Sequence, residues 1–176
     1  MAKSSEDAET EGVLHVANLM CVAARTAPKA RGIDNIVSTV LTGKEKESLA
    51  RKMEQFGKRT ERPHTFARDA NNVRQAQALV LIGTKIGPVG LNCGFCGFDN
   101  CQKCKQARAR CAHNSGDLGI AVGSAVSVAS NHRVDNRVMY TVGWTSVNGK
   151  ILGEKAKIIL GIPLSASGKN IFFDRK

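Results

Sequence analysis

Apolar positions in the first half of the chain recur first at helical spacing and then in unbroken runs. Between residues 12 and 25 they form a wide stripe, which predicts a largely buried helix. Residues 1–11 are polar and acidic, and predict a mobile N-terminus. Four further elements follow from the same pattern: a β-branched strand over 34–42, a charged amphipathic helix over 44–58, a short helix over 68–78 after a polar connector at 59–64, and a buried strand over 79–83.

The second half predicts a helix rich in small residues, which starts near Asp117 and carries Gly119, Gly123 and Ser127. Asp117 is expected to cap this helix, whose small face suits close contact with a neighbouring helix or with a second copy of the chain. Residues 131–147 are expected to be mostly helical, with a break near Gly143. A strand over 157–164 is expected near an edge or end of the sheet because of Pro163. The sequence therefore predicts one α+β domain over 12–176, closed by an apolar pair at 172–173.

Composition narrows the possible environment and partners of this domain. The net charge of +11 invites a nucleic-acid interpretation, but the basic residues are spread along the whole chain without interleaved aromatics, so no nucleic-acid partner is expected. No targeting segment or membrane-spanning run is apparent, and no membrane partner is expected. The expected location is the cytoplasm, where thiols stay reduced.

Five of the six cysteines lie between positions 93 and 111. Thiols this close in sequence are poorly placed to link distant parts of a fold and well placed to surround one metal centre. The remaining cysteine, Cys21, falls on the apolar stripe of the first helix and is interpreted as a small core residue. The sequence therefore predicts a metal or iron–sulfur site between residues 90 and 113.

Spacing separates the metal candidates but leaves one ligand open. Two Cys-x2-Cys pairs only four residues apart fit poorly to a zinc ribbon, whose pairs usually lie about 15–20 residues apart. An iron–sulfur cluster is favoured over zinc, and a thiol redox pair is the third alternative. Cys93, Cys96 and Cys101 are the expected ligands, and the fourth is either Cys104 or Cys111. Basic residues within the stretch would offset thiolate charge: Lys103, Lys105, Arg108 and Arg110.

The order Cys-Gly-x-Cys-Gly-Phe-x-x-Cys resembles the [4Fe-4S] segments of electron-transfer subunits of the Rnf type. Nearly all of residues 12–175 also resembles a prokaryotic family described as ferredoxin-domain-containing proteins. Segments that carry this resemblance include Thr-Ala-Pro-Lys-Ala-Arg-Gly-Ile at 26–33, Gly-Leu-Asn-Cys-Gly-Phe-Cys-Gly-Phe at 90–98 and Gly-Ile-Pro-Leu-Ser-Ala-Ser-Gly-Lys-Asn at 161–170. This resemblance implies Cys93, Cys96, Cys101 and Cys111 as the ligands, and makes Cys104 a departure.

The order of elements is also similar to that of flavin-dependent nitroreductases, from the first helix ending in Ala-Pro to the late Leu-Gly-x-Pro strand. That resemblance implies a nitroreductase-like layout, FMN held between two subunits, and therefore a homodimer. Lys29, Arg31 and Lys169 are the implied phosphate-binding residues. Two elements of those enzymes are absent, the early Arg-x-Ser and the Gln-Pro-Trp after the turn, and residues 26–33 also suit an ordinary surface loop.

The expected function is one-electron transfer by a [4Fe-4S] cluster, with FMN left open as a second cofactor. The expected partner is a redox protein or a flavin or nicotinamide donor. No His, Asp and Cys constellation points to an acid, base or nucleophile, so an enzymatic role, if present, would be that of a flavin-dependent reductase. The alternative is a structural or regulatory module that zinc or the cluster merely stabilises.

Overall fold

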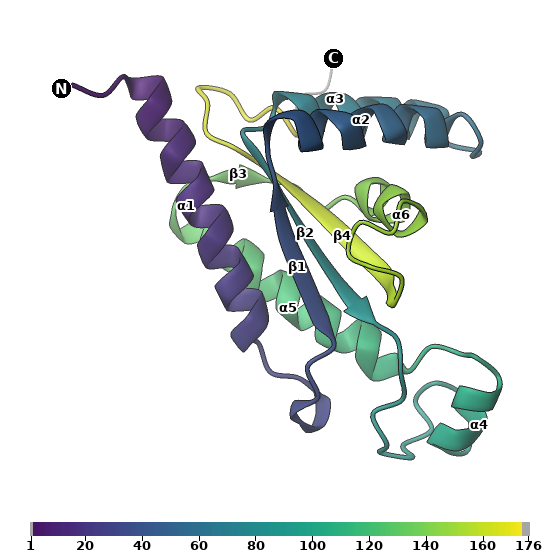
Figure 1. Ribbon diagram of the computed structural model, residues 1–176. Helices are drawn as coiled ribbons and strands as arrows, with labels where there is room; N and C mark the ends of the chain where they lie inside the picture. The colour runs from purple at the N-terminus through teal and green to yellow at the C-terminus, as the bar shows by residue number, and fades with distance from the viewer. Residues whose placement is uncertain (1, 174–176) are drawn as a thin grey trace.

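The computed structural model describes residues 2–173 and is built around one antiparallel sheet. The strands β1 (Ile36–Leu41), β2 (Ala78–Lys85), β3 (Asp135–Asn136) and β4 (Ala156–Ser165) lie in the order β1-β2-β4-β3. One face is covered by α1 (Ser5–Thr26) and α5 (Ala112–Asn131) (Figure 1). The other is covered by α2 (Gly43–Gly57), α3 (Pro63–Gln75) and α6 (Tyr140–Asn148). The result is a helix–sheet–helix arrangement of mixed α and β structure.

β2 forms the centre of both cores. Its side chains alternate between the faces, so that Val80 and Ile82 pack with α1 and α5 whereas Leu79 and Leu81 pack with the other three helices. All four are fully buried. A continuous apolar run is therefore what a strand covered on both faces requires, which confirms the buried strand expected at 79–83.

The first helix begins earlier than the apolar stripe indicates. α1 starts at Ser5, so residues 5–11 of the segment that was expected to be mobile are helical. Ser4 caps the helix by accepting a hydrogen bond from the Asp7 amide at 3.1 Å, and Glu6 and Asp7 stand in the first turn where carboxylates favour the helix dipole. The polar and acidic residues at the start of the chain are therefore the solvent-exposed first turns of α1.

Three expectations for the second half need correction. α5 starts at Ala112, so Asp117 lies inside the helix and does not cap it. α5 ends at Asn131, residues 132–139 are not helical but contain β3, and α6 runs through Gly143 without a break. Gly143 is needed because α6 lies against β4: a Cβ there would come within 1.6 Å of the Ile159 carbonyl oxygen. The glycine thus marks a close approach of helix to strand.

Pro163 lies on an inner strand, since β4 pairs with β2 along its length and with the two-residue β3 on its other side. The amide of Gly161 faces the β3 side, where it donates to Met139 at 3.1 Å. Strand amides two residues apart point the same way, so the missing N–H of Pro163 also faces this sparsely paired side. The expectation that β4 is an edge strand is therefore wrong. The nitrogen of Pro163 nevertheless faces β3, the side on which β4 has few backbone hydrogen bonds.

The C-terminal apolar pair is divided. Phe172 is buried in the core beneath α2, α3 and α6, as expected, whereas Phe173 is 59% exposed and lies under the Arg137 guanidinium. Cys21 is half-buried against the α1–α5 core, as a small core residue would be. Within residues 2–173, no helix is both long enough and apolar enough to cross a membrane.

The cysteine segment leaves the body at one end of the sheet, where Lys85 of β2 pairs with Ala156 of β4. From there the chain runs through an irregular loop and α4 (Cys101–Gln106) before it enters α5. Figure 1 shows α4 and its loops as a projection below the sheet, near the short helix η1 (Ala30–Gly32). We call this end of the sheet the cysteine end.

Candidate metal centre

All five cysteines of the segment line one small pocket. The loop curls round it with the help of Gly94 and Gly97, whose φ angles of 74° and 81° lie in the left-handed region that glycine adopts without strain. Among residues 2–173, no three His, Cys, Asp or Glu side chains already stand in the arrangement of a bound metal ion. The fold thus brings the thiols to one place but does not lock them in coordination geometry.

Asn92 makes two hydrogen bonds with Cys101 and so fixes this cysteine in the loop around the pocket. The Cys101 amide donates to Asn92 Oδ1 at 2.9 Å, and the Asn92 amide points at Cys101 Sγ at 3.4 Å. Asn100 then caps α4, because its Oδ1 accepts the Lys103 amide at 2.9 Å. Backbone amides directed at sulfur are the contacts that favour thiolates and tune iron–sulfur centres.

The five thiols differ in burial. Cys104 and Cys111 are 1% and 5% exposed, Cys96 and Cys101 are half-buried, and Cys93 is exposed at the rim. Burial raises the pKa of the Cys104 thiol, and its hydrogen bond with Cys96 and the neighbouring thiols of Cys111 and Cys101 act in the same direction. Cys104 Sγ also donates to the Ala109 carbonyl oxygen at 3.7 Å, a bond that only a protonated thiol can make.

His113 was not among the expected site residues. Its Nε2 lies 3.6 Å from Cys93 Sγ, and its ring lies against that of Phe95, with centroids 5.8 Å apart. Phe95 is 76% exposed. Asn92 was missed as well, although both residues flank the cysteines in sequence, which was the available signal. His113 therefore places a ring nitrogen beside an otherwise sulfur-only set of donors.

Two long-range contacts anchor the base of the segment. Arg31 Nη1 donates to the Val89 carbonyl at 2.9 Å, and the Gly87 amide donates to Asn114 Oδ1 at 3.0 Å. Asn114 is fully buried, and its Nδ2 has no hydrogen-bond partner among the described residues. The thiol pocket is therefore fixed to both η1 and α5.

The expected phosphate ligands Lys29 and Arg31 flank the turn after α1. The Lys29 ammonium donates to the carbonyls of Ala24, at 3.1 Å, and Arg25, and Asp34 lies 3.9 Å away. Lys29 therefore closes the C-terminus of α1, and its side chain is only 6% exposed. Arg31 is exposed but is bonded to the cysteine segment, as described above.

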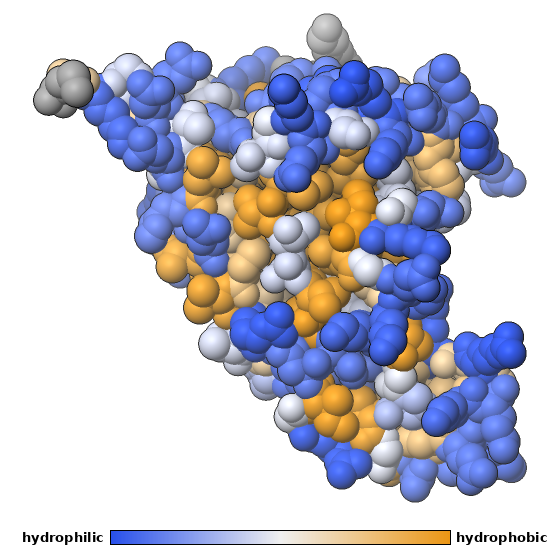
Figure 2. All heavy atoms as spheres, viewed as in Figure 1, coloured by the Kyte–Doolittle hydropathy of each residue, from blue (hydrophilic) through white to orange (hydrophobic). Residues whose placement is uncertain are grey.

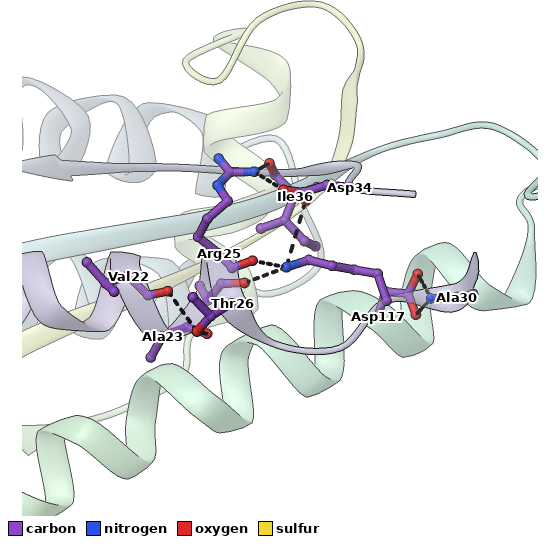
Figure 3. Close-up of polar contacts among 10 residues, drawn as sticks. Val22, Ala23, Arg25, Thr26, Ala30, Asp34, Ile36 and Asp117 are labelled. Carbon is purple, nitrogen blue, oxygen red and sulfur yellow. Dashed lines mark hydrogen bonds and ion pairs between the residues drawn. The ribbon is translucent and has the colours of Figure 1, made fainter. Parts of the chain in front are cut away.

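Asp117 fixes this turn from α5. Its two carboxylate oxygens accept the Ala30 amide at 3.1 and 3.2 Å, while Arg25 pairs with Asp34 and reaches the Ile36 carbonyl at 2.9 Å (Figure 3). The buried carboxylate is thus a structural clamp. The amide that would otherwise face an anion at this turn is already bound.

Within one chain, Lys169 lies at the opposite end of the sheet from the other two phosphate candidates, Lys29 and Arg31. Lys29 and Arg31 precede β1, whose first residue, Ile36, pairs with Thr84 at the cysteine end, whereas Lys169 follows Ser165 at the far end of β4. The eight residues of β2 between these ends span roughly 25 Å. A site containing all three would need a second chain.

Fold and site together define an α+β protein with a thiol-rich segment at one end of its sheet. Five sulfur donors around one pocket, with the Asn92 amide directed at Cys101 Sγ, fit an iron–sulfur cluster or a thiolate-bound zinc ion. Residues 107–175 match the family described as uncharacterized proteins containing a ferredoxin domain. A protein of Archaeoglobus fulgidus is 41% identical over 185 residues, covering 99% of this chain and 98% of that protein.

The chain therefore belongs to this ferredoxin-domain family. The family description suggests an iron–sulfur electron-transfer role. The matched residues include Cys111 but begin after Cys104, so the match does not decide between the ligand assignments.

Solved structures show the nitroreductase fold. An FMN-bound nitroreductase of Desulfitobacterium hafniense is 14% identical, with a TM-score of 0.61 over 96% of this chain and 81% of that one. A second FMN-bound nitroreductase, from Bacteroides fragilis, is 12% identical and has a TM-score of 0.62 over 92% of this chain and 81% of its own. The expected nitroreductase-like layout is confirmed, and identities this low show the fold alone.

Proposed function

We propose that this protein carries a [4Fe-4S] cluster and transfers electrons through it. The observation that carries the proposal is the convergence of five of the six thiols on one pocket, with the backbone amide of Asn92 directed at the Cys101 sulfur. The family description as a ferredoxin domain supports the same chemistry. When bound, such a cluster would accept and release one electron at a time.

The proposed ligands are Cys93, Cys96, Cys101 and Cys111. Ligation needs thiolates, and the hydrogen bond from Cys104 to the Ala109 carbonyl favours the protonated form of that residue. Cys104 would then be a buried neighbour of the cluster. Asn92 would orient the Cys101 sulfur by its amide, and Asn100 would hold the first turn of α4 in place.

The rim of the pocket offers access to a redox partner. Cys93 and Phe95 are both exposed there, whereas Cys104 and Cys111 form the buried floor. A partner protein, or a flavin or nicotinamide donor, would approach from this side. Buried sulfurs on one side and an open rim on the other would let the chain exclude water from most of the site without blocking exchange.

Zinc is the second candidate, because His113 lies beside Cys93 and nitrogen is a ligand that zinc accepts readily. In that case the metal would only stabilise the segment. Purification without oxygen, followed by a visible spectrum and analysis of iron, sulfide and zinc, separates the two. Iron and sulfide in equal amounts support the cluster, and one zinc per colourless chain supports the structural module.

FMN binding is a further proposal that rests on the fold. Two of the similar structures are described with bound FMN, and Arg31 is the exposed cation at the corresponding Ala-Pro turn. The site would be shared between two copies of the chain, with Lys169 supplied by the second. Titration of FMN fluorescence tests this: quenching that saturates supports it, and unchanged fluorescence with a correctly folded dimer removes it.

A further inference from the structure

A cavity of ≈ 590 Å³ lies beside the thiol pocket, outside the residues assigned to the cluster. Its walls are the chain after β2 at 86–88, the end of α4 with the turn that follows it at 105–110, and the chain that enters β4 at 154–157. Figure 2 shows a notch between the projecting lobe that holds α4 and the body above it. The volume falls within the range of about 300–1,000 Å³ that small-molecule sites occupy.

The cavity is lined by unpaired positive charge. Its cationic residues are Lys105, Arg108, Arg110, Lys155 and Lys157. Within residues 2–173 none of the five forms an ion pair, and the one acidic wall residue, Glu154, is paired with Lys150 at 2.5 Å. Five like charges around one hollow repel each other, so a bound polyanion would relieve this repulsion.

A second hollow of ≈ 350 Å³ adjoins the first and shares Arg110 and Lys157 with it. It lies between α6 and β4 and presents two aromatic rings, those of Tyr140 and Trp144. These side chains are 45% and 47% exposed, so both rings can be reached from solvent. A planar ring placed there could stack on an indole or a phenol.

We propose that the two hollows form one nucleotide-binding site. The phosphates of a nucleoside diphosphate would lie in the basic cavity, and Arg110 and Lys157 would hold the phosphate nearest the sugar. The base would lie against Trp144 and Tyr140. This site differs from the Ala-Pro turn considered for FMN, and it stands whether or not the thiol pocket holds a cluster.

The single tryptophan of the chain lies at the site and serves as a reporter. Adenosine diphosphate is added to the full chain, purified without oxygen, while Trp144 fluorescence and binding heat are recorded. We expect saturable quenching by adenosine diphosphate and competition by pyrophosphate. We also expect pyrophosphate alone to bind more weakly, because it lacks the ring.

Charge variants locate the site. Combining Arg110→Gln with Lys157→Gln should weaken adenosine diphosphate binding by roughly tenfold or more, since each variant removes a charged hydrogen bond. Lys103→Gln is the control: it removes a cation from α4 of the same projecting segment, but Lys103 is paired with Asp99 and does not line the cavity. Its affinity should be unchanged.

Three results would overturn the proposal. They are binding that does not saturate, equal loss of affinity in the Lys103→Gln control, and a pyrophosphate affinity equal to that of adenosine diphosphate. Iron and sulfide are measured in every preparation, so that failure of the cluster proposal is seen separately from failure of nucleotide binding.

Discussion

At the scale of single residues, the ligand assignment depends on the contrast between Cys104 and Cys111. Both thiols are buried on the same pocket, but only Cys104 donates to a carbonyl oxygen. Cys111→Ser should therefore lose most of the iron, whereas Cys104→Ser should retain it, as measured by iron and sulfide analysis after purification without oxygen. The reverse pattern would make Cys104 the fourth ligand.

Sequence predicted which residues gather here but not how they are held. Thiol spacing was enough to expect one site for Cys93 to Cys111, because the chain between them is short. Thiol spacing could not predict the Asn92 contact with Cys101 or the His113 contact with Cys93, because both depend on loop geometry. Lys29 was a candidate phosphate ligand by resemblance alone, and nothing in the sequence indicated that its ammonium donates to the last carbonyls of α1.

The carboxylate of Asp117 gives a prediction of the same scale. It is 6% exposed and accepts the Ala30 amide with both oxygens. Asp117→Ala should lower the free energy of unfolding by about 1–3 kcal/mol, because it leaves the half-buried Ala30 amide without an acceptor. Urea denaturation measures this. Asp99→Asn, which breaks an exposed pair with Lys103, should cost less than about 1 kcal/mol, and equal costs would refute the clamp.

At the scale of elements, most of the first half was predictable and the region after α5 was not. β1 and β2 are β-branched or continuous apolar runs, α2 has helical periodicity, and all three lie within a few residues of their expected positions. Residues 131–147 carry no clear period, because β3 has only two residues and α6 is set by its contact with β4. Gly143 was expected to break a helix, but it instead lets α6 lie directly against the backbone of β4.

That contact can be tested by a single methyl group. Gly143→Ala would force a Cβ into the backbone of Ile159, which has no flexible end that can move aside. We expect a loss of about 3 kcal/mol or more in the free energy of unfolding, measured by urea denaturation. Gly12→Ala in α1 is the control, since its Cβ would meet nothing within 4 Å and should stabilise the helix by up to about 1 kcal/mol. A neutral Gly143→Ala would contradict the described packing of α6.

At the scale of the whole molecule, the fold resembles nitroreductases, whereas the candidate chemistry lies in a segment attached to one end of the sheet. Order of elements alone predicted this layout, because long periodic helices and a central apolar strand are robust signals. Charge distribution was not predictable in the same way. The basic residues look dispersed in sequence, yet five of them meet in one cavity because the turn after α4 and the loop before β4 lie together.

The exposed small residues of α5 lead us to expect a homodimer. Gly116, Gly119 and Gly123 of α5 have open space at their Cβ positions, and Ile120 between them is 47% exposed. Light scattering should give twice the chain mass of 18.9 kDa. Ile120→Glu should give the monomer mass, and Ile120→Val should keep the dimer. A monomeric native chain would contradict this expectation and would also leave Lys169 away from any shared site.

The presence of the proposed [4Fe-4S] cluster is tested most simply by the iron, sulfide and zinc content and the visible spectrum of protein purified without oxygen. We expect a brown protein with a broad visible absorption that bleaches on reduction, and with about four iron and four sulfide per chain. A colourless protein that holds one zinc, or a chain without metal after anaerobic purification, would contradict it.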